Sequence, residues 1–197
     1  MNVRQTHPTL VDACWQKESA FIRNIVLAVA GSIVLWISAK IQIPFYPVPV
    51  SMQTLVVLMI GMAFGWKLGA STIALYLAEG FAGLPVFAGT PEKGIGIAYM
   101  AGPTGGYLFG FVIAAAAVGW LAERGFDRSI MLTAVAMLVG SVLIYIPGIA
   151  WLGSIVGWDK PVMQWGMLPF LYGDALKLLL AALLMPALWK LIGWKSP

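Results

Sequence analysis

The fold class follows from one stretch near the C-terminus, residues 173–184, which reads GDALKLLLAALL. It places an acid, Asp174, and a base, Lys177, three positions apart at the head of an otherwise apolar run. Such runs are typical of membrane-spanning helices, where an acidic or basic side chain costs roughly 2.5–3.5 kcal/mol at the centre of the bilayer. A compensating contact is therefore expected, and we expect it to be a small polar ligand.

The composition of the whole chain agrees with this placement. The chain has 197 residues, of which 60% are hydrophobic and only 10% are charged, whereas about 25% are charged in soluble domains. A soluble protein of this length could not bury so much apolar surface. We therefore expect an all-α integral membrane protein with about six transmembrane helices.

The apolar segments define the expected domain organisation. Residues 1–20 are polar and are predicted to form a cytoplasmic N-terminal tail without a cleavable signal peptide, and residues 21–197 are predicted to form one transmembrane domain. Its spans are expected at about 21–43, 51–64, 68–79, 107–121, 130–152 and 173–189, with a kink at Pro147. Between them lie a Pro-rich turn (42–50), a Gly-rich loop (80–106) and an aromatic loop (153–172).

The distribution of Lys and Arg predicts the orientation, because cytoplasmic loops of membrane proteins carry an excess of both. With an even number of spans, both termini lie on one side. Most of the cations fall on that side, namely Arg4, Lys17, Arg23, Lys67, Arg124, Arg128, Lys190 and Lys195, and only Lys40, Lys93 and Lys160 fall on the other. Both termini are therefore expected in the cytoplasm, which places the three long connections and the head of the last span outside.

Several function classes are disfavoured by what the chain contains. The net charge of +4 is spread over segment ends, which indicates membrane orientation and no nucleic-acid partner. With one cysteine, Cys14, and one histidine, His7, the chain offers neither a disulfide nor a His/Cys metal site nor a histidine-based triad. The ATP-binding pattern G-x-x-x-x-G-K-[ST] is also missing. We expect no enzymatic activity, no metal and no cofactor.

Four polar residues are candidate ligand contacts, and each has a structural alternative. Asp174 and Lys177 could neutralise one another at i, i+3 spacing, and Asp174 could cap the helix N-terminus. Glu79, at the outer end of the third span, could be an interface residue in water. Gln53, in the first turn of the second span, could cap that helix or bond internally.

The Gly-rich loop and the first span supply the remaining candidates. Gly105 and Gly106 could be turn residues or could expose backbone N–H groups to a carboxylate, and Tyr107 could be an interfacial aromatic or a pocket wall. Ala28 and Ser32, four apart in the first span, form a small-residue face. Such a face packs against neighbours within the chain or docks another membrane subunit.

Several motifs together make the chain similar to a known family. The chain resembles the BioY family, the biotin-binding membrane subunits (S components) of energy-coupling factor transporters. The motifs that carry the resemblance occur at 41–44, 47–55, 83–89, 102–108, 110–111 and 168–170, followed by Gly173, Asp174 and Lys177.

The resemblance implies a function and partners. It implies a high-affinity subunit for biotin uptake in the plasma membrane, with its pocket near the external surface, that works with a transmembrane coupling protein and ATPase subunits. Ala28 and Ser32 would belong to the docking face. Biotin would be the bound ligand, and the lipid bilayer would surround the subunit.

Biotin chemistry matches the candidate residues. Asp174 could accept hydrogen bonds from the ureido N–H groups, and Lys177 could donate to the ureido carbonyl. Thr104 or the N–H groups near Gly105 and Gly106 would suit the carboxylate. Phe87, Tyr107 or the tryptophans would suit the apolar ring.

Two other function classes remain as alternatives. A stand-alone ion-coupled secondary transporter of a small vitamin-like solute would often show inverted repeats and a site near the bilayer midplane. The sequence shows no convincing repeat, and its polar groups cluster towards the outside. An intramembrane enzyme would need a nucleophile and a base in one place, and no such constellation is visible.

Overall fold

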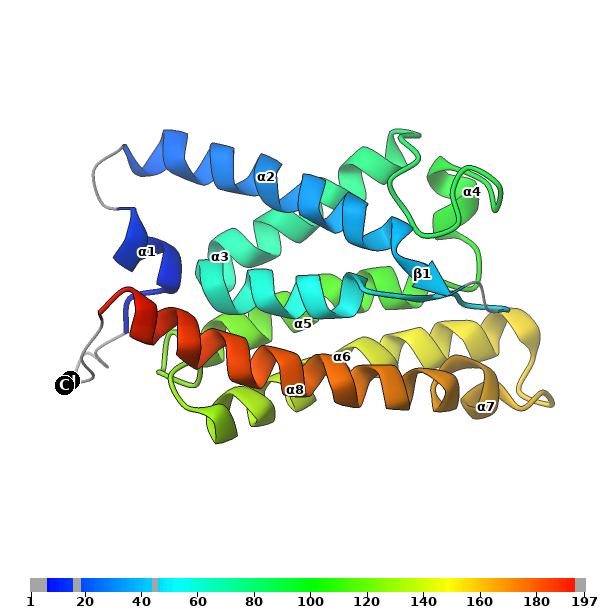
Figure 1. Cartoon of the computed structure of the whole chain (residues 1–197). Coiled ribbons are helices and arrows are strands. Elements are labelled where there is room, and N and C mark those ends of the chain that lie inside the picture. Colours follow the sequence, from blue (N-terminus) through cyan, green and yellow to red (C-terminus); the bar gives the residue numbers. More distant parts are fainter. Residues whose placement is uncertain (1–6, 16–18, 44–45, 194–197) are drawn as a thin grey trace, which may run out of the picture.

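The computed structural model describes residues 7–15, 19–43 and 46–193. Within this part of the chain, five helices are long and apolar enough to cross a membrane. They are α2 (Ala20–Lys40), α3 (Gln53–Phe81), α5 (Gly105–Ala122), α6 (Ile130–Val156) and α8 (Leu168–Leu191) (Figure 1). Shorter elements are α1 (Leu10–Cys14), α4 (Gly96–Met100), α7 (Val162–Gly166) and the antiparallel strands β1 (Gln42–Ile43) and β2 (Val50–Ser51).

Helix α3 consists of two helical arms that form a hairpin. Its backbone leaves the helical region at Gly65, where φ is +79°, a value that favours glycine. A Cβ on Gly69 would lie 2.9 Å from the Cα of Gly61, whereas eight residues of straight helix span about 12 Å. The predicted second and third spans are therefore both present, so that about six transmembrane helices are confirmed.

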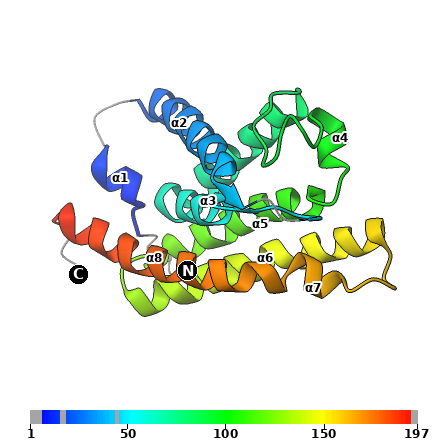
Figure 2. The same cartoon turned by 45° about the vertical axis from the view of Figure 1, so that its right-hand side comes forward.

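The two ends of the bundle differ in structure. The bend of α3, the turn at 123–129, α1 and the end of α8 gather at one end, which we call the inner end (Figure 1). The β1–β2 hairpin, α4 and α7 gather at the opposite, outer end (Figure 2). The first arm of α3, 53–64, is about 18 Å long and α2 is about 31 Å long at 1.5 Å per residue. The space that this short arm leaves at the outer end is where the hairpin and the loops lie.

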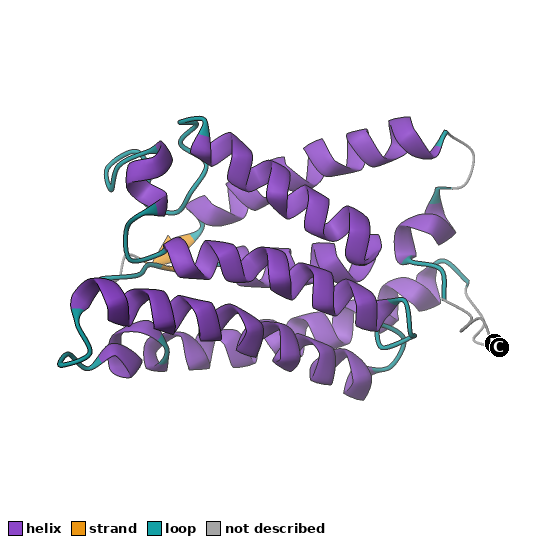
Figure 3. Cartoon of the chain, turned by 180° about the vertical axis from the view of Figure 1, so that it is seen from behind, coloured by secondary structure: helices purple, strands orange, loops and turns teal. Residues whose placement is uncertain are grey.

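Helix α5 is the centre of the packing, between α3 on one side and α6 on the other (Figure 3). Glycines allow the backbones to approach closely. A Cβ on Gly61 would lie 2.5 Å from the carbonyl oxygen of Ala115, and one on Gly119 would lie 2.5 Å from the backbone of Trp66. Helix α8 packs mainly against α6 and touches α3 and β2 near its beginning.

The structure differs from the predicted spans and loops in three places. Helix α8 begins at Leu168, before the expected start at Gly173, because Pro169 lies in its first turn, where proline is tolerated. The Gly-rich and aromatic loops contain the short helices α4 and α7. Helix α6 continues without interruption through Pro147 to Val156. Of the predicted tail at 1–20, residues 1–6 and 16–18 lie outside the described residues, as do 44–45 of the Pro-rich turn.

A buried charged cluster closes the inner end. Asp127 is fully buried, and its Oδ2 accepts a hydrogen bond of 2.6 Å from the indole Nε1 of Trp189 in α8. The guanidinium of Arg128 lies over the ring of Trp189 and donates to the carbonyl oxygen of Pro8. Burial raises the pKa of Asp127 to about 6, although Trp189 and Arg128 oppose the shift. The cluster joins α8, the 123–129 turn and the N-terminal segment.

Candidate binding site

A cavity at the outer end lies among β2, the beginning of α3, the loops around α4, and α5, α6 and α8. Its wall is mostly aliphatic and aromatic, with a polar group of side chains on one part. Its lining includes Val48, Ser51, Gln53, Thr54, Ala88, Tyr99, Thr104, Tyr107, Ile144, Tyr145, Phe170, Asp174 and Lys177. A mainly apolar concave site with a few convergent polar groups is typical of small-molecule binding.

Lys177 links three segments of the polar wall. Its ammonium group donates to the carbonyl oxygen of Ser51 at 2.8 Å, to the hydroxyl of Thr54 at 2.9 Å and to Oδ1 of Asp174 at 3.0 Å. An ammonium group has three hydrogens, so these acceptors use its full donor capacity. Lys177 is only 8% exposed, and its contacts connect α8 to β2 and to the first turn of α3.

Asp174 receives donors on both oxygens. Lys177 and Thr54 donate to Oδ1, the latter at 3.3 Å, and the hydroxyl of Tyr145 in α6 donates to Oδ2. A carboxylate can accept about four hydrogen bonds, so Oδ2 retains room for one further donor. Because Asp174 lines the cavity, a ligand N–H group could fill that position.

The cavity is narrow as the side chains stand. The enclosed cavity has a volume of about 50 Å³. Together with the open space at its mouth, the empty volume is about 590 Å³. A bicyclic ligand therefore requires some side chains or the covering loops to shift. Rotamer changes of side chains on binding are common, and loop rearrangements occur in a substantial minority of complexes.

Hydrogen bonds hold the loops over the cavity. Gln53 donates to the hydroxyl of Tyr76 at 2.7 Å, and Tyr76 donates in turn to the carbonyl oxygen of Val86 at 2.8 Å. Tyr99 of α4 donates to the carbonyl oxygen of Ala88 at 2.6 Å. The predicted internal bonding of Gln53 is thus present, and Gln53 also lines the cavity.

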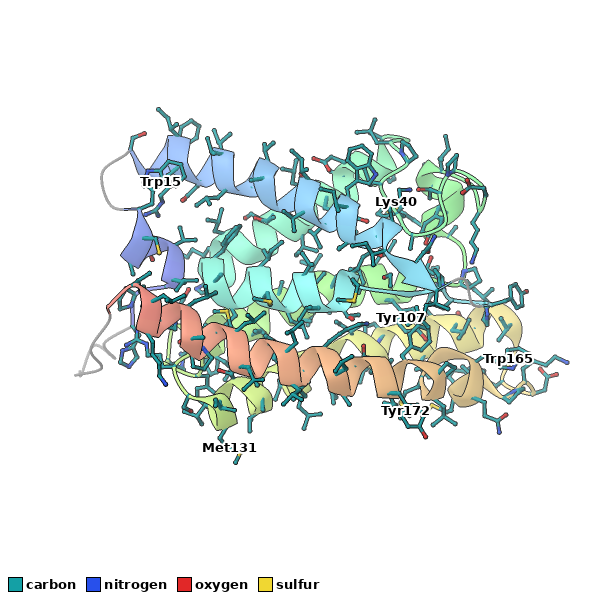
Figure 4. All side chains as sticks on the ribbon, in the orientation of Figure 1. Trp15, Lys40, Tyr107, Met131, Trp165 and Tyr172 are labelled. Atoms are coloured by element: carbon teal, nitrogen blue, oxygen red, sulfur yellow. The ribbon has the colours of Figure 1, made fainter. Side chains whose placement is uncertain are left out.

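The ammonium group of Lys40, at the outer end of α2, adds a further anchor. It donates to the carbonyl oxygens of Phe87 and Thr90, at 3.2 and 2.8 Å. Figure 4 shows Lys40 at the same end of the bundle as Tyr107 and Trp165, and opposite Trp15. The loop over the cavity is therefore fastened from α2, α3 and α4.

Residues predicted from the Gly-rich loop divide into two groups. Thr104 and Tyr107 line the cavity, and the hydroxyl of Tyr107 donates to the carbonyl oxygen of Gly166 at 2.8 Å. Gly105 and Gly106 do not line it. A Cβ on Gly105 would lie 1.9 Å from the carbonyl oxygen of Met100, and one on Gly106 would lie 2.3 Å from that of Pro147. Both glycines serve close backbone packing.

Phe87 and Glu79 also lie away from the cavity lining. Phe87 is 1% exposed, and its ring packs against those of Tyr76 and Tyr99. Its neighbour Ala88 is the residue that reaches the cavity. Glu79 lies on the second arm of α3, where its Oε1 is 2.9 Å from the hydroxyl of Ser32 in α2.

The two residues of the predicted docking pair, Ala28 and Ser32, differ in exposure. Ser32 is 2% exposed and contacts α3, which matches the alternative of packing within the chain. Ala28 is partly exposed and lines a groove at the inner end between α1, α2 and α3.

Tyr145, Thr54 and Ser51 are functional candidates that sequence reasoning missed. Tyr145 is one of several hydroxyl-bearing side chains in the apolar run of 130–156. It is on a different helix from Asp174, so no sequence spacing reveals their contact. Thr54 and Ser51 flank Gln53 in the 47–55 motif, so their position in that motif is a signal that could have found them.

Comparisons with known proteins agree on one family. The model of the BioY family matches residues 7–194. The biotin transporter BioY of Thermotoga maritima is 35% identical over 86% of this chain and 98% of its own length. A probable biotin transporter BioY of Pyrococcus horikoshii is 38% identical over 72% of this chain and 80% of its own length.

A solved structure has the same fold. It is described as the S-component for biotin from an ECF-type ABC transporter, and it superimposes with a TM-score of 0.72 at 24% sequence identity. The match covers 86% of this chain and 92% of that one. At this identity the likeness establishes the arrangement of the helices.

Proposed function

This chain belongs to the BioY family, and from that premise we propose that it is the biotin-binding membrane subunit of a biotin uptake system. The chain is a multi-pass protein of the plasma membrane that binds and delivers its ligand and performs no chemical step. Its relatives carry the name biotin transporter. The observation that carries the proposal is the Asp174–Lys177 pair, whose side chains are 13% and 10% exposed on the polar part of a mainly apolar cavity.

The cavity suits the ureido end of biotin. The free acceptor position on Oδ2 of Asp174 takes a ureido N–H group, and the surrounding Phe170 and Ile144 cover the apolar ring. Lys177 has no donor left for the ureido carbonyl unless that oxygen replaces Ser51 or Thr54 as an acceptor. We therefore assign Lys177 the role of holding the carboxylate of Asp174 in a fixed orientation.

The carboxylate end of biotin belongs on the loop side of the cavity. Among the described lining residues, Lys177 is the only cation, and its hydrogens are engaged by the protein. A second anion would be costly beside Asp174, because like charges in a poorly solvated site repel. The valerate chain therefore extends towards Thr104 and the mouth, where water can solvate its end.

Energy for uptake comes from partner subunits. The sequence has no G-x-x-x-x-G-K-[ST] phosphate-binding pattern, so a transmembrane coupling protein and separate ATPase subunits supply the work. Biotin uptake measured with and without those ATPase subunits separates this arrangement from an ion-coupled secondary transporter. Uptake at the full rate without ATPases, and its collapse when the ion gradient is removed, would favour the secondary transporter.

The binding experiment uses purified chain in detergent and labelled biotin. We expect saturable binding below micromolar concentration, and at least a tenfold loss of affinity in Asp174→Asn, which keeps the shape of the side chain but removes its charge. Asp159→Asn, an exposed acid in the turn before α7, is the matched control and should bind like the wild type. No binding by the wild type at micromolar biotin would contradict the proposed function.

A further inference from the structure

Glu79 is an acid placed deep in the predicted membrane region. It contacts Ser32, which is 12 residues from the beginning of α2 at Ala20 and 8 residues from its end at Lys40. At 1.5 Å per residue the contact is about 18 Å and about 12 Å from the two ends of a helix that spans the bilayer. Glu79 therefore lies within the hydrocarbon, where an ionised side chain is expensive and usually functional.

The chain provides little to stabilise this carboxylate. The hydroxyl of Ser32 has one hydrogen, and its oxygen is 3.0 Å from the carbonyl oxygen of Val29 and 2.9 Å from Oε1 of Glu79. In the described part of the chain, Glu79 thus receives at most one shared donor of the four that a carboxylate can accept. No ion pair joins Glu79 to a described Lys or Arg.

The position is also accessible from outside the bundle. The side chain of Glu79 is partly exposed, and its chain neighbour Ala78 on α3 is exposed. On α2, Val29 and Ile33, three residues before and one residue after Ser32, are exposed as well. Ala78 is small, and Ala74 one turn before it is small and exposed as well. A second helix can approach closely beside small residues.

We propose that Glu79 is a docking contact for a transmembrane helix of the coupling partner, and that this helix carries a Lys or Arg at the depth of Glu79. The inference rests on the proposed function for the existence of such a partner. A cationic side chain would fill the empty acceptor positions of the carboxylate and remove its unpaired charge from the hydrocarbon.

The test compares assembly and ligand binding in the same variants. The full chain is tagged and co-expressed with the transmembrane coupling protein and the ATPase subunits from the same genome, and the amount of coupling protein retained per chain is measured. Glu79→Gln removes the charge and keeps a side-chain oxygen that can accept from Ser32, so the chain should fold. Glu92→Gln, an exposed acid in the outer loop, is the matched control for the same chemical change.

We expect Glu79→Gln to retain at least tenfold less coupling protein than the wild type or Glu92→Gln, and Glu79→Lys to retain none. Biotin affinity of the purified Glu79→Gln chain should stay within twofold of the wild type. Ser32→Ala, which removes the internal contact and leaves the acid, should still assemble.

Three results would overturn the inference. The first is assembly of Glu79→Gln at the wild-type level, and the second is the lack of any wild-type assembly. The third is loss of biotin binding together with assembly in Glu79→Gln, which would show that Glu79 supports the fold. Failure of the proposed function looks different, because the wild-type chain would then not bind biotin at all.

Discussion

Tyr145 shows how a single hydroxyl on α6 prepares an acid on α8. Its hydroxyl donates to Oδ2 of Asp174, while Lys177 and Thr54 donate to Oδ1. These donors fix the plane of the carboxylate before a ligand arrives, which lowers the ordering cost of binding. These four side chains come from three helices, α3, α6 and α8. Only Asp174 and Lys177 stand out in the sequence, because they are an acid and a base in an apolar run.

Replacement of Tyr145 by Phe should weaken biotin binding about tenfold. The change removes one donor to a charged acceptor, an interaction that contributes about 1.5–3 kcal/mol, and part of that loss is recovered by water. Titration of purified variants with labelled biotin measures the effect. Tyr172→Phe, at an 88% exposed position, loses the same atom away from the cavity and should bind normally. Unchanged or tighter binding by Tyr145→Phe would mean that the ligand displaces this hydroxyl.

Asp127 should make stability depend on pH. Its pKa is about 6 in the folded protein and 3.8 without the fold, so the folded state binds the extra proton between these values. The resulting stabilisation is present below pH 4 and is lost as the pH rises through 6. The loss amounts to about 3 kcal/mol at 1.36 kcal/mol per pKa unit.

The variant Asp127→Asn tests this dependence. Asn resembles the protonated acid, so the variant should match the wild type at pH 4 and be more stable at pH 7. Thermal unfolding in detergent, followed by tryptophan fluorescence at several pH values, gives the comparison. Parallel profiles for the two proteins would show that Asp127 does not titrate in this range.

At the scale of elements, most of the fold was predictable and the short pieces were not. Long apolar runs located the membrane helices, and the Gly65-Trp66-Lys67 turn separated the two arms of α3. The helices α4 and α7 have five residues each, which is too short for a hydrophobic period to show. The contact between Tyr145 and Asp174 depends on how α6 packs on α8, which no local pattern encodes.

The contact between α3 and α5 should tolerate no added side chain at Gly61. The Ala115 backbone is in the way of a Cβ there, so Gly61→Ala should destabilise the protein by about 1–3 kcal/mol. Gly173→Ala in α8 is the matched control, since the nearest atom to its Cβ would be 4.0 Å away. This control should gain up to about 1 kcal/mol of helix propensity. Equal thermal midpoints in detergent for the two variants would contradict the close approach of the helices.

At the scale of the molecule, the inner and outer ends differ in a way that fixes orientation. Cations concentrate at the inner end, and the cavity lies at the outer end. Cys14 of α1 is exposed and is the one cysteine of the chain. The chain thus contains its own reporter for the side on which α1 lies.

A membrane-impermeant maleimide should label Cys14 only after the cells are permeabilised. The positive-inside distribution places α1 in the cytoplasm, out of reach of the reagent in intact cells. A Cys14→Ser chain that also carries Lys160→Cys, at the outer end, should be labelled in intact cells. Labelling of Cys14 from outside would reverse the orientation and put the cavity mouth in the cytoplasm.

The triple attachment of Lys177 limits how this pocket could acquire another vitamin. The ammonium group of Lys177 has no hydrogen left for a ligand. Replacing Lys177 would nevertheless remove the hydrogen bonds to β2, to the first turn of α3 and to Asp174 together. Changes of specificity would therefore have to begin elsewhere, at Val48, Ala88 and Ile144, whose aliphatic side chains touch the cavity and form no hydrogen bonds. In natural or engineered variants, we therefore expect substitutions in the hydrophobic lining, whereas the residues of the polar wall are retained.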